Sequence, residues 1–162
     1  MFEKFKLIII GPADIAGVIR VQERAYLPFF HENAESFVSK MKLSPATCYG
    51  VLNEGRLVAY GISFPWFKSQ GVDLNSTLTE NSVKPDLMYI HDISVDPDYR
   101  GLGLGEALFK KIFEDTLSNG LNELALVAVQ GSKTFWARFG FTITDSEVKG
   151  YGPDAVTMVL KL

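Results

Sequence analysis

The sequence has only one cysteine and no long apolar run near its start. Its single cysteine, Cys48, excludes an intramolecular disulfide and fits a reducing environment. The start of the chain offers only the four-residue apolar run LIII (7–10), which is too short for a signal peptide or a membrane span. We therefore expect a cytoplasmic protein without a membrane partner.

Positive charge is also scarce. The 162 residues carry 16 lysines and arginines against 19 aspartates and glutamates, for a net charge of −3, and no long basic run is present. Proteins that bind nucleic acids usually present a basic patch or stripe. We therefore expect no nucleic-acid partner, and nothing in the sequence calls for a bound metal.

The size and composition are those of an ordinary globular domain. A chain of 162 residues can bury about two-thirds of its unfolded surface in one core. Hydrophobic residues make up 47% of it and charged residues 22%, and no internal repeat or low-complexity linker divides it. We expect a single domain over residues 1–162.

Hydrophobic periodicity and turn residues predict alternating strands and helices. The expected strands are 7–10, a hairpin at 48–64 that turns at Glu54-Gly55, 87–95, 121–129, 141–145 and 155–162. The expected helices are 13–25, 32–42, one that begins near Glu106 and closes at Asn119-Gly120, and a short one from 131 to about 138. Residues 65–87 form a long polar loop, and loops of that length are usually functional.

The fold class follows from how these elements connect. Residues 87–129 form a strand, a glycine turn, a helix and an apolar strand, so the two strands should be parallel with a right-handed crossover. The hairpin makes the remaining strands antiparallel. We expect a mixed, mostly antiparallel α/β sheet with a central βαβ crossover.

The stretch DPDYRGLGLGEALF (96–109) places Arg100 and three alternating glycines, Gly101, Gly103 and Gly105, where a strand gives way to a helix. The first amides of a helix lack partners and carry partial positive charge, so a phosphate can bind there if the backbone is accessible. A plain tight turn is the alternative. A P-loop is excluded because no Lys-Ser/Thr pair follows, and G-x-G-x-x-G fails at Glu106.

The spacing of Arg100, Gly103 and Gly105, Arg/Gln-x-x-Gly-x-Gly/Ala, resembles that of the GCN5-related N-acetyltransferase (GNAT) superfamily, whose members transfer an acyl group from acyl-coenzyme A to an amine. ISV-DPDYRGLGLGEAL resembles the family's strand–turn–helix signature, and ALVAVQGSKTFWARFGF resembles its next strand and helix. The detailed resemblance covers about residues 87–141. It implies that the strand at 87–95 is splayed away from the strand at 121–129 and that the acyl arm enters the gap.

The resemblance also implies that acetyl-CoA is the co-substrate. The amides of 102–105, with Arg100, would hold its pyrophosphate, and the Val95 amide would polarise the thioester carbonyl. Gln130 stands where many relatives have asparagine. The implied coenzyme-binding residues are Ile93, Ser94, Val95, Arg100, Gly101, Leu102, Gly103, Leu104, Gly105, Gln130, Ser132 and Trp136.

A general base is expected because only a neutral amine attacks a thioester. Strand alternation places Tyr89, His91 and Ile93 on one face and Asp92 on the other. Relatives often carry the base or a water-holding residue at the positions of His91 and Tyr89, and an unperturbed histidine pKa of ~6.5 suits a base. A structural histidine is the alternative. Asp92 would tie down a helix or orient a loop.

The general acid is where the sequence departs from the family. Relatives commonly have a tyrosine at Trp136, and an indole N–H is no practical acid. Tyr151 and Tyr89 are the candidate replacements, and Ser132 would hydrogen-bond the sulfur. A thiol of pKa ~8.5 is a tolerable leaving group, so the acid is not essential.

Aromatic residues suit the acceptor side. Tyr26, Phe29, Phe30 and Trp66 lie in segments that wall the acceptor in such folds, where they would stack on a substrate or bind an ammonium group. Core packing or homodimer contacts explain them equally well.

These patterns together predict an N-acetyltransferase that moves an acetyl group directly, in a ternary complex, to a small-molecule or peptide amine. No nucleophile is obvious, since Cys48 lies on a hairpin strand. Two other interpretations stay open: a non-catalytic acyl-CoA-binding or sensor module, and a plain α/β interaction domain with a structural glycine turn.

Overall fold

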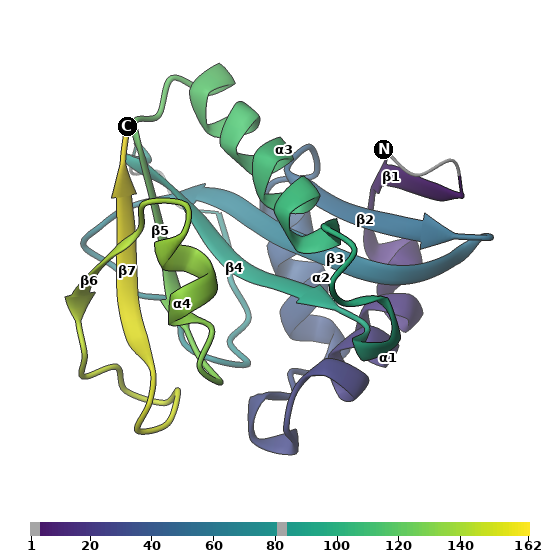
Figure 1. Ribbon diagram of the computed structural model, residues 1–162. Coiled ribbons are helices and arrows are strands. Elements are labelled where there is room, and N and C mark those ends of the chain that lie inside the picture. Colours follow the sequence, from purple (N-terminus) through teal and green to yellow (C-terminus); the bar gives the residue numbers. More distant parts are fainter. Residues whose placement is uncertain (1–3, 81–83) are drawn as a thin grey trace.

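The computed structural model describes residues 4–80 and 84–162. Over these residues the chain forms one sheet of seven strands in the order β1-β2-β3-β4-β5-β7-β6, with helices on both faces (Figure 1). Every neighbouring pair is antiparallel except β4 and β5, which are parallel. The predicted mixed α/β sheet with its βαβ crossover is confirmed.

The elements follow the predicted order. The strands are β1 Phe5–Ile9, β2 Cys48–Asn53, β3 Arg56–Trp66, β4 Leu87–Val95, β5 Glu123–Ala128, β6 Thr142–Asp145 and β7 Val156–Lys161. The α-helices are α1 Ile15–Ala25, α2 Ala34–Leu43, α3 Leu104–Ser118 and α4 Lys133–Ala137, and the 3-10 turns are η1 Pro12–Asp14, η2 Pro28–Phe30 and η3 Pro97–Tyr99. No helix among the described residues has the length and apolar character needed to cross a bilayer.

Boundaries differ from the prediction by a few residues. The first helix starts as the 3-10 turn η1, and β3 continues through Trp66, so the long loop begins two residues later than predicted. The loop packs back on the protein, with Val72 buried. Residues 81–83 of the predicted 65–87 loop lie outside the described part of the chain.

The two largest of three apolar clusters among the described residues lie on opposite faces of the sheet. Helix α3 buries Leu104, Leu108 and Ile112, which are four residues apart and therefore share one helix face, against β3, β4 and β5. On the other face, α1 and α2 bury a second cluster that includes Phe37 and Tyr60. Figure 1 shows α3 and α4 in front of the sheet and α1 and α2 behind it.

Strands β4 and β5 separate after a short paired stretch. Their pairing covers only Met88–Ile90 against Leu124–Leu126, whereas β4 stays paired to β3 as far as Val95. The edge of β4 beyond Ile90 is therefore not covered by β5, and Figure 1 shows the two strands diverging toward α1 and α4. This is the splayed arrangement that the resemblance implied.

A β-bulge in β4 corrects the predicted side-chain faces. The pairing with β3 steps from Ile90 to Asp92, so His91 is an extra residue on β4. Ile90 and Ile93 consequently both pack in the core beneath α3, while His91 contacts Phe37 of α2 and Asp92 bonds to Tyr60. The predictions that His91 shares a face with Ile93, and that Asp92 faces away from His91, were wrong. One inserted residue shifts the alternation of everything after it.

Candidate active site

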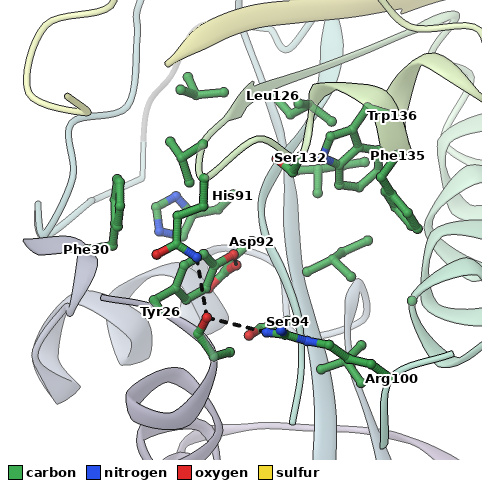
Figure 2. A pocket seen from close by; sticks show the side chains of 18 of the residues that line it. Tyr26, Phe30, His91, Asp92, Ser94, Arg100, Leu126, Ser132, Phe135 and Trp136 are labelled. Carbon is green, nitrogen blue, oxygen red and sulfur yellow. Dashed lines mark hydrogen bonds between the residues drawn. The ribbon is translucent and has the colours of Figure 1, made fainter. Parts of the chain in front are cut away.

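A cavity of about 610 Å³ opens where β4 and β5 diverge. Its wall includes the turn that precedes α3, the end of α1 and Phe30 of η2. Figure 2 shows Tyr26, Phe30, His91 and Asp92 on one side of it and Phe135 and Trp136 on the other. The cavity thus joins a helix N-terminus to a group of titratable side chains.

The glycine turn has a backbone that other residues adopt with strain. Gly101 and Gly103 have φ of +78° and +82°, in the left-handed region. Gly103 is the N-cap of α3, and no side chain among the described residues bonds to the free amides there. A Cβ on Gly105 would lie 3.5 Å from Phe135 and 3.8 Å from Val95, in ordinary contact. The turn therefore leaves the first amides of α3 open to an anion.

Arg100 and Gln130 bridge the cavity to the end of α1. Arg100 Nη2 and Gln130 Nε2 each donate to the carbonyl of Ala25 at 3.4 Å. Figure 2 shows Arg100 with its hydrogen bond as a dashed line. The backbone amide of Leu27 donates to Gln130 Oε1 at 2.9 Å. Gln130 does this from a left-handed backbone, with φ of +51°. Its amide, predicted to contact the coenzyme, is here bonded to the backbone of Ala25 and Leu27.

His91 is paired with Glu32, a residue just before α2. Their Nε2 and Oε2 atoms are 2.6 Å apart, and the two side chains are 2% and 3% exposed. Burial alone would raise the pKa of Glu32, but the charges of His91 and Lys40, with hydrogen bonds from His91 and Ser36, lower it to about 2. Glu32 is therefore a carboxylate at neutral pH.

The partnership of His91 with Glu32 is the main feature that the sequence did not predict. Glu32 and His91 are 59 positions apart, and an acidic residue before a helix is usually solvated. One usable signal is the spacing of Glu32, Ser36 and Lys40, four residues each, which places all three on one side of the helix predicted over 32–42. Lys40 lies fully buried there, 3.4 Å from Glu32.

Asp92 ties the end of α1 to the sheet. Its two oxygens accept hydrogen bonds from the hydroxyls of Tyr26 and Tyr60, each at 2.5 Å. Burial raises the pKa of Asp92 to about 6, although the charge of His91 and the two hydroxyl bonds act in the opposite direction. Its predicted role in holding a helix fits these contacts.

Tyr151 lines the cavity, but its hydroxyl proton is already donated to a backbone carbonyl. Its hydroxyl donates to the carbonyl of Val72 at 2.5 Å. Burial and the proximity of Tyr89 raise the pKa of Tyr151 well above its ordinary value. In this arrangement Tyr151 anchors the loop that follows β3.

Most of the predicted site residues meet in the cavity. From the described part of the chain, its wall includes His91, Tyr151, Tyr26, Phe30, Ile93, Ser94, Val95, Arg100, Gly101, Gly103, Leu104, Gly105, Gln130, Ser132 and Trp136. Four predicted residues are not on that wall within the described residues: Tyr89, Trp66, Phe29 and Leu102. Tyr89 and Trp66 pack with Phe64 in a separate apolar cluster, while Phe29 and Leu102 are 57% and 39% exposed.

The described residues include one cysteine, and its environment does not activate it as a nucleophile. Cys48 is buried on β2, and its burial raises the thiol pKa to about 11. A nucleophilic cysteine needs a lowered pKa. No group of three or more histidine, cysteine, aspartate or glutamate side chains among the described residues is arranged to hold a metal ion.

Trp136 stands where the resemblance noted above implies a tyrosine in relatives. It is buried and packs edge-on against Phe109, Phe135 and Phe141, with centroid distances of 5.9, 5.0 and 5.4 Å. One part of its indole lines the cavity opposite His91 (Figure 2). Its place is that of an apolar wall.

Comparisons with known proteins agree on one family. A sequence model of the Acetyltransferase (GNAT) family matches residues 17–141. The chain is 27% identical over 138 residues to an uncharacterized N-acetyltransferase of Bacillus subtilis, covering 76% of this chain and 60% of that protein. It is 30% identical over 106 residues to thialysine N-epsilon-acetyltransferase of Mus musculus, covering 65% of this chain and 50% of that one. The matches thus span less than two thirds of these relatives.

Among solved structures, the fold is similar to that of PaiA N-acetyltransferase from Thermoplasma acidophilum in complex with coenzyme A. The TM-score is 0.73 at 12% sequence identity, and the match covers 98% of this chain and 99% of that one. At this identity the likeness concerns the fold alone.

Proposed function

Since the chain belongs to the GNAT family of acetyltransferases, we propose that it transfers an acetyl group from acetyl-CoA to an amine in a ternary complex. The observation that carries this proposal is the single cavity wall that joins the glycine turn at the start of α3 to the buried pair of His91 and Glu32. One end suits an anionic coenzyme, and the other suits proton transfer.

The coenzyme end fits acetyl-CoA in three respects. The free amides at the start of α3 and the Arg100 guanidinium suit a pyrophosphate. The uncovered edge of β4 from His91 to Val95 offers backbone groups to the pantetheine arm. The gap between β4 and β5 connects the start of α3 with the uncovered edge of β4. Acetyl-CoA bound in this gap would supply the activated acyl group.

The acceptor end suits a protonated amine. Asp92 places a carboxylate beside the aromatic rings of Tyr26 and Phe30 on the cavity wall. Carboxylates and aromatic faces both attract an ammonium group. Lys40, the buried cation nearest to Glu32, is engaged with that carboxylate and with the Ser76 carbonyl. We propose a small-molecule or peptide amine as the acceptor.

Direct transfer is favoured over an acyl-enzyme. The buried Cys48 thiol is on β2 and not on the cavity wall among the described residues. His91 takes the proton of the bound amine, a step that typically contributes ~10²–10⁴-fold in rate. Because the coenzyme A thiolate is a stable leaving group, a wall formed by Trp136 in place of an acid is compatible with turnover.

The first test is calorimetric titration with acetyl-CoA and then with free coenzyme A, followed by a thiol-release assay with a panel of amines. Micromolar binding and amine-dependent thiol release are expected. Binding without release from any amine would favour a non-catalytic acyl-CoA-binding module of the same fold. The absence of binding would overturn the proposal.

As a second test, His91→Ala should lower thiol release by about 10²–10⁴-fold while the affinity for acetyl-CoA stays nearly unchanged. The reason is that His91 lies at the acceptor end and not at the α3 turn. Wild-type rates in this variant would return His91 to a structural role.

A further inference from the structure

The two nitrogens of the His91 ring have different surroundings. Nε2 is 2.6 Å from Glu32 Oε2. Nδ1 is buried and has no hydrogen-bond partner among the described residues, and His91 is one of the residues that line the cavity. Buried polar atoms without partners are uncommon in native proteins and call for an explanation. A substrate that enters the cavity and bonds to Nδ1 would explain this unpaired nitrogen.

The hydrogen-bond chemistry of Glu32 determines which nitrogen carries the proton. An ionised carboxylate accepts hydrogen bonds and donates none. The contact of Glu32 Oε2 with His91 Nε2 therefore requires a proton on Nε2. In the neutral ring Nδ1 then holds a lone pair, and it is the nitrogen left for a substrate.

The other oxygen of Glu32 fixes the carboxylate in this orientation. Oε1 accepts hydrogen bonds from Ser36 Oγ at 2.8 Å, from the backbone amide of Asn75 at 2.9 Å and from Lys40 Nζ at 3.4 Å. Three donors thus hold one oxygen and leave the other to His91. Asn75 belongs to the loop whose Leu74 lines the cavity, so the same carboxylate also connects this loop to His91.

We propose that Glu32 is a positioning residue that holds His91 as the Nε2–H tautomer, so that Nδ1 accepts the proton of the acceptor ammonium. This inference rests on the proposed acetyltransferase function. A purely structural histidine pair would not require a free Nδ1 beside a cavity.

The protons balance along this route. The ammonium gives one proton to Nδ1, and the resulting imidazolium stays paired with Glu32. The neutral amine forms a bond to the thioester carbon, and the carbon–sulfur bond then breaks. The second amine proton goes to the leaving thiolate, which yields free coenzyme A and the amide. The imidazolium releases its proton to solvent after the products leave.

The sharpest test is Glu32→Gln. Three donors surround the Oε1 position, so the amide oxygen must face them and the amide NH2 must face His91. The NH2 donates to Nε2, which forces the proton onto Nδ1. We expect the 15N NMR signals of His91 to change from the Nε2–H to the Nδ1–H pattern. We also expect kcat to fall by on the order of 10²-fold, with unchanged affinity for acetyl-CoA.

His31 provides an internal reference for the spectra. It is the only other histidine of the sequence, and its Nε2 lies 2.7 Å from the Tyr26 carbonyl, which can only accept. Its Nε2–H pattern should persist in every variant. Glu23→Gln makes the same chemical change on an exposed side chain of α1 and should alter neither the His91 tautomer nor kcat.

Glu32→Gln leaves the Lys40 ammonium buried beside a neutral amide, without its carboxylate partner. The Glu32→Gln substitution is therefore also made in a Lys40→Met background, where the Ser36 hydroxyl and the backbone amide of Asn75 still bond to the amide oxygen. An Nε2–H ring in Glu32→Gln, or an inverted tautomer with wild-type kcat, would overturn the positioning role. Wild-type protein that binds acetyl-CoA but acetylates no amine would overturn the proposed function and the proton step, whatever the tautomer.

Discussion

Two glycines that are two residues apart should respond oppositely to the same substitution. Gly103 has a left-handed backbone, with φ of +82°. Gly105 lies in the first turn of α3. A Cβ on Gly103 would meet nothing within 4 Å, and one on Gly105 would be in ordinary contact with Phe135 at 3.5 Å. Neither alanine is therefore opposed by a clash, and backbone preference decides the outcome.

The magnitudes follow from that preference. A left-handed alanine costs about 1–2 kcal/mol, whereas alanine in place of glycine in a helix contributes up to about 1 kcal/mol. For a chain of 162 residues, each kcal/mol moves Tm by about 2–4 °C. Gly103→Ala should thus lower Tm by about 2–8 °C, and Gly105→Ala should raise it by up to about 4 °C.

Coenzyme affinity should separate the two variants as well. Gly103→Ala can relieve its strain only by turning the backbone, which redirects the amides at the start of α3. The same 1–2 kcal/mol corresponds to roughly a 5- to 30-fold weaker binding constant for acetyl-CoA. Gly105→Ala keeps those amides in place and should bind nearly as well as wild type.

Thermal denaturation and calorimetric titration of the two variants test both expectations. If Gly103→Ala were as stable and bound as tightly as wild type, the left-handed turn would not be what shapes the anion site. If both variants lost stability equally, backbone preference would be the wrong explanation.

Two further predictions concern charge. Arg100→Ala should weaken acetyl-CoA binding by about tenfold or more, because a charge-assisted hydrogen bond contributes ~1.5–3 kcal/mol. Calorimetry at two salt concentrations measures this change. An unchanged affinity would mean that the Arg100 guanidinium does not bind the coenzyme. The pKa of Asp92 is raised in the folded state to about 6, so the folded form binds a proton more tightly than the unfolded form, and Asp92 destabilises the fold as pH rises from ~4 through 6. The free energy of unfolding of Asp92→Asn, relative to that of wild type, should therefore be about 1–3 kcal/mol higher at pH 7 than at pH 4. Urea denaturation at the two pH values measures this difference, and a pH-independent difference would contradict the reasoning.

The glycine turn at the start of α3, which we propose binds the coenzyme, was predictable because its determinants are local. The glycine spacing, Arg100 and the start of α3 all lie within a few residues, and left-handed turns have a recognisable residue preference. The order of strands and helices follows equally from local periodicity. These features depend little on which distant segments come together.

The part of the cavity around His91, which we propose binds the acceptor, was less predictable because its determinants are non-local. Trp66 and Tyr89 were expected near the acceptor or the reacting groups, yet they pack with Phe64 in a separate cluster. Composition does not separate an aromatic residue of a core from one on a cavity wall. Only the packing of the 65–80 segment against α2 and β4 separates them.

The bulge at His91 is the strongest case of such non-local control. In a regular strand, His91 and Asp92 would point to opposite faces, and Asp92 would enter the apolar core beneath α3. The extra residue turns Asp92 to the face of α1 and α2, where Tyr26 and Tyr60 satisfy its two oxygens, while His91 reaches Glu32. Nothing in the letters IHDIS marks this step, because it is set by the pairing with β3. The bulge therefore brings the candidate base and its neighbouring carboxylates to one side of the cavity, and removing it should separate them.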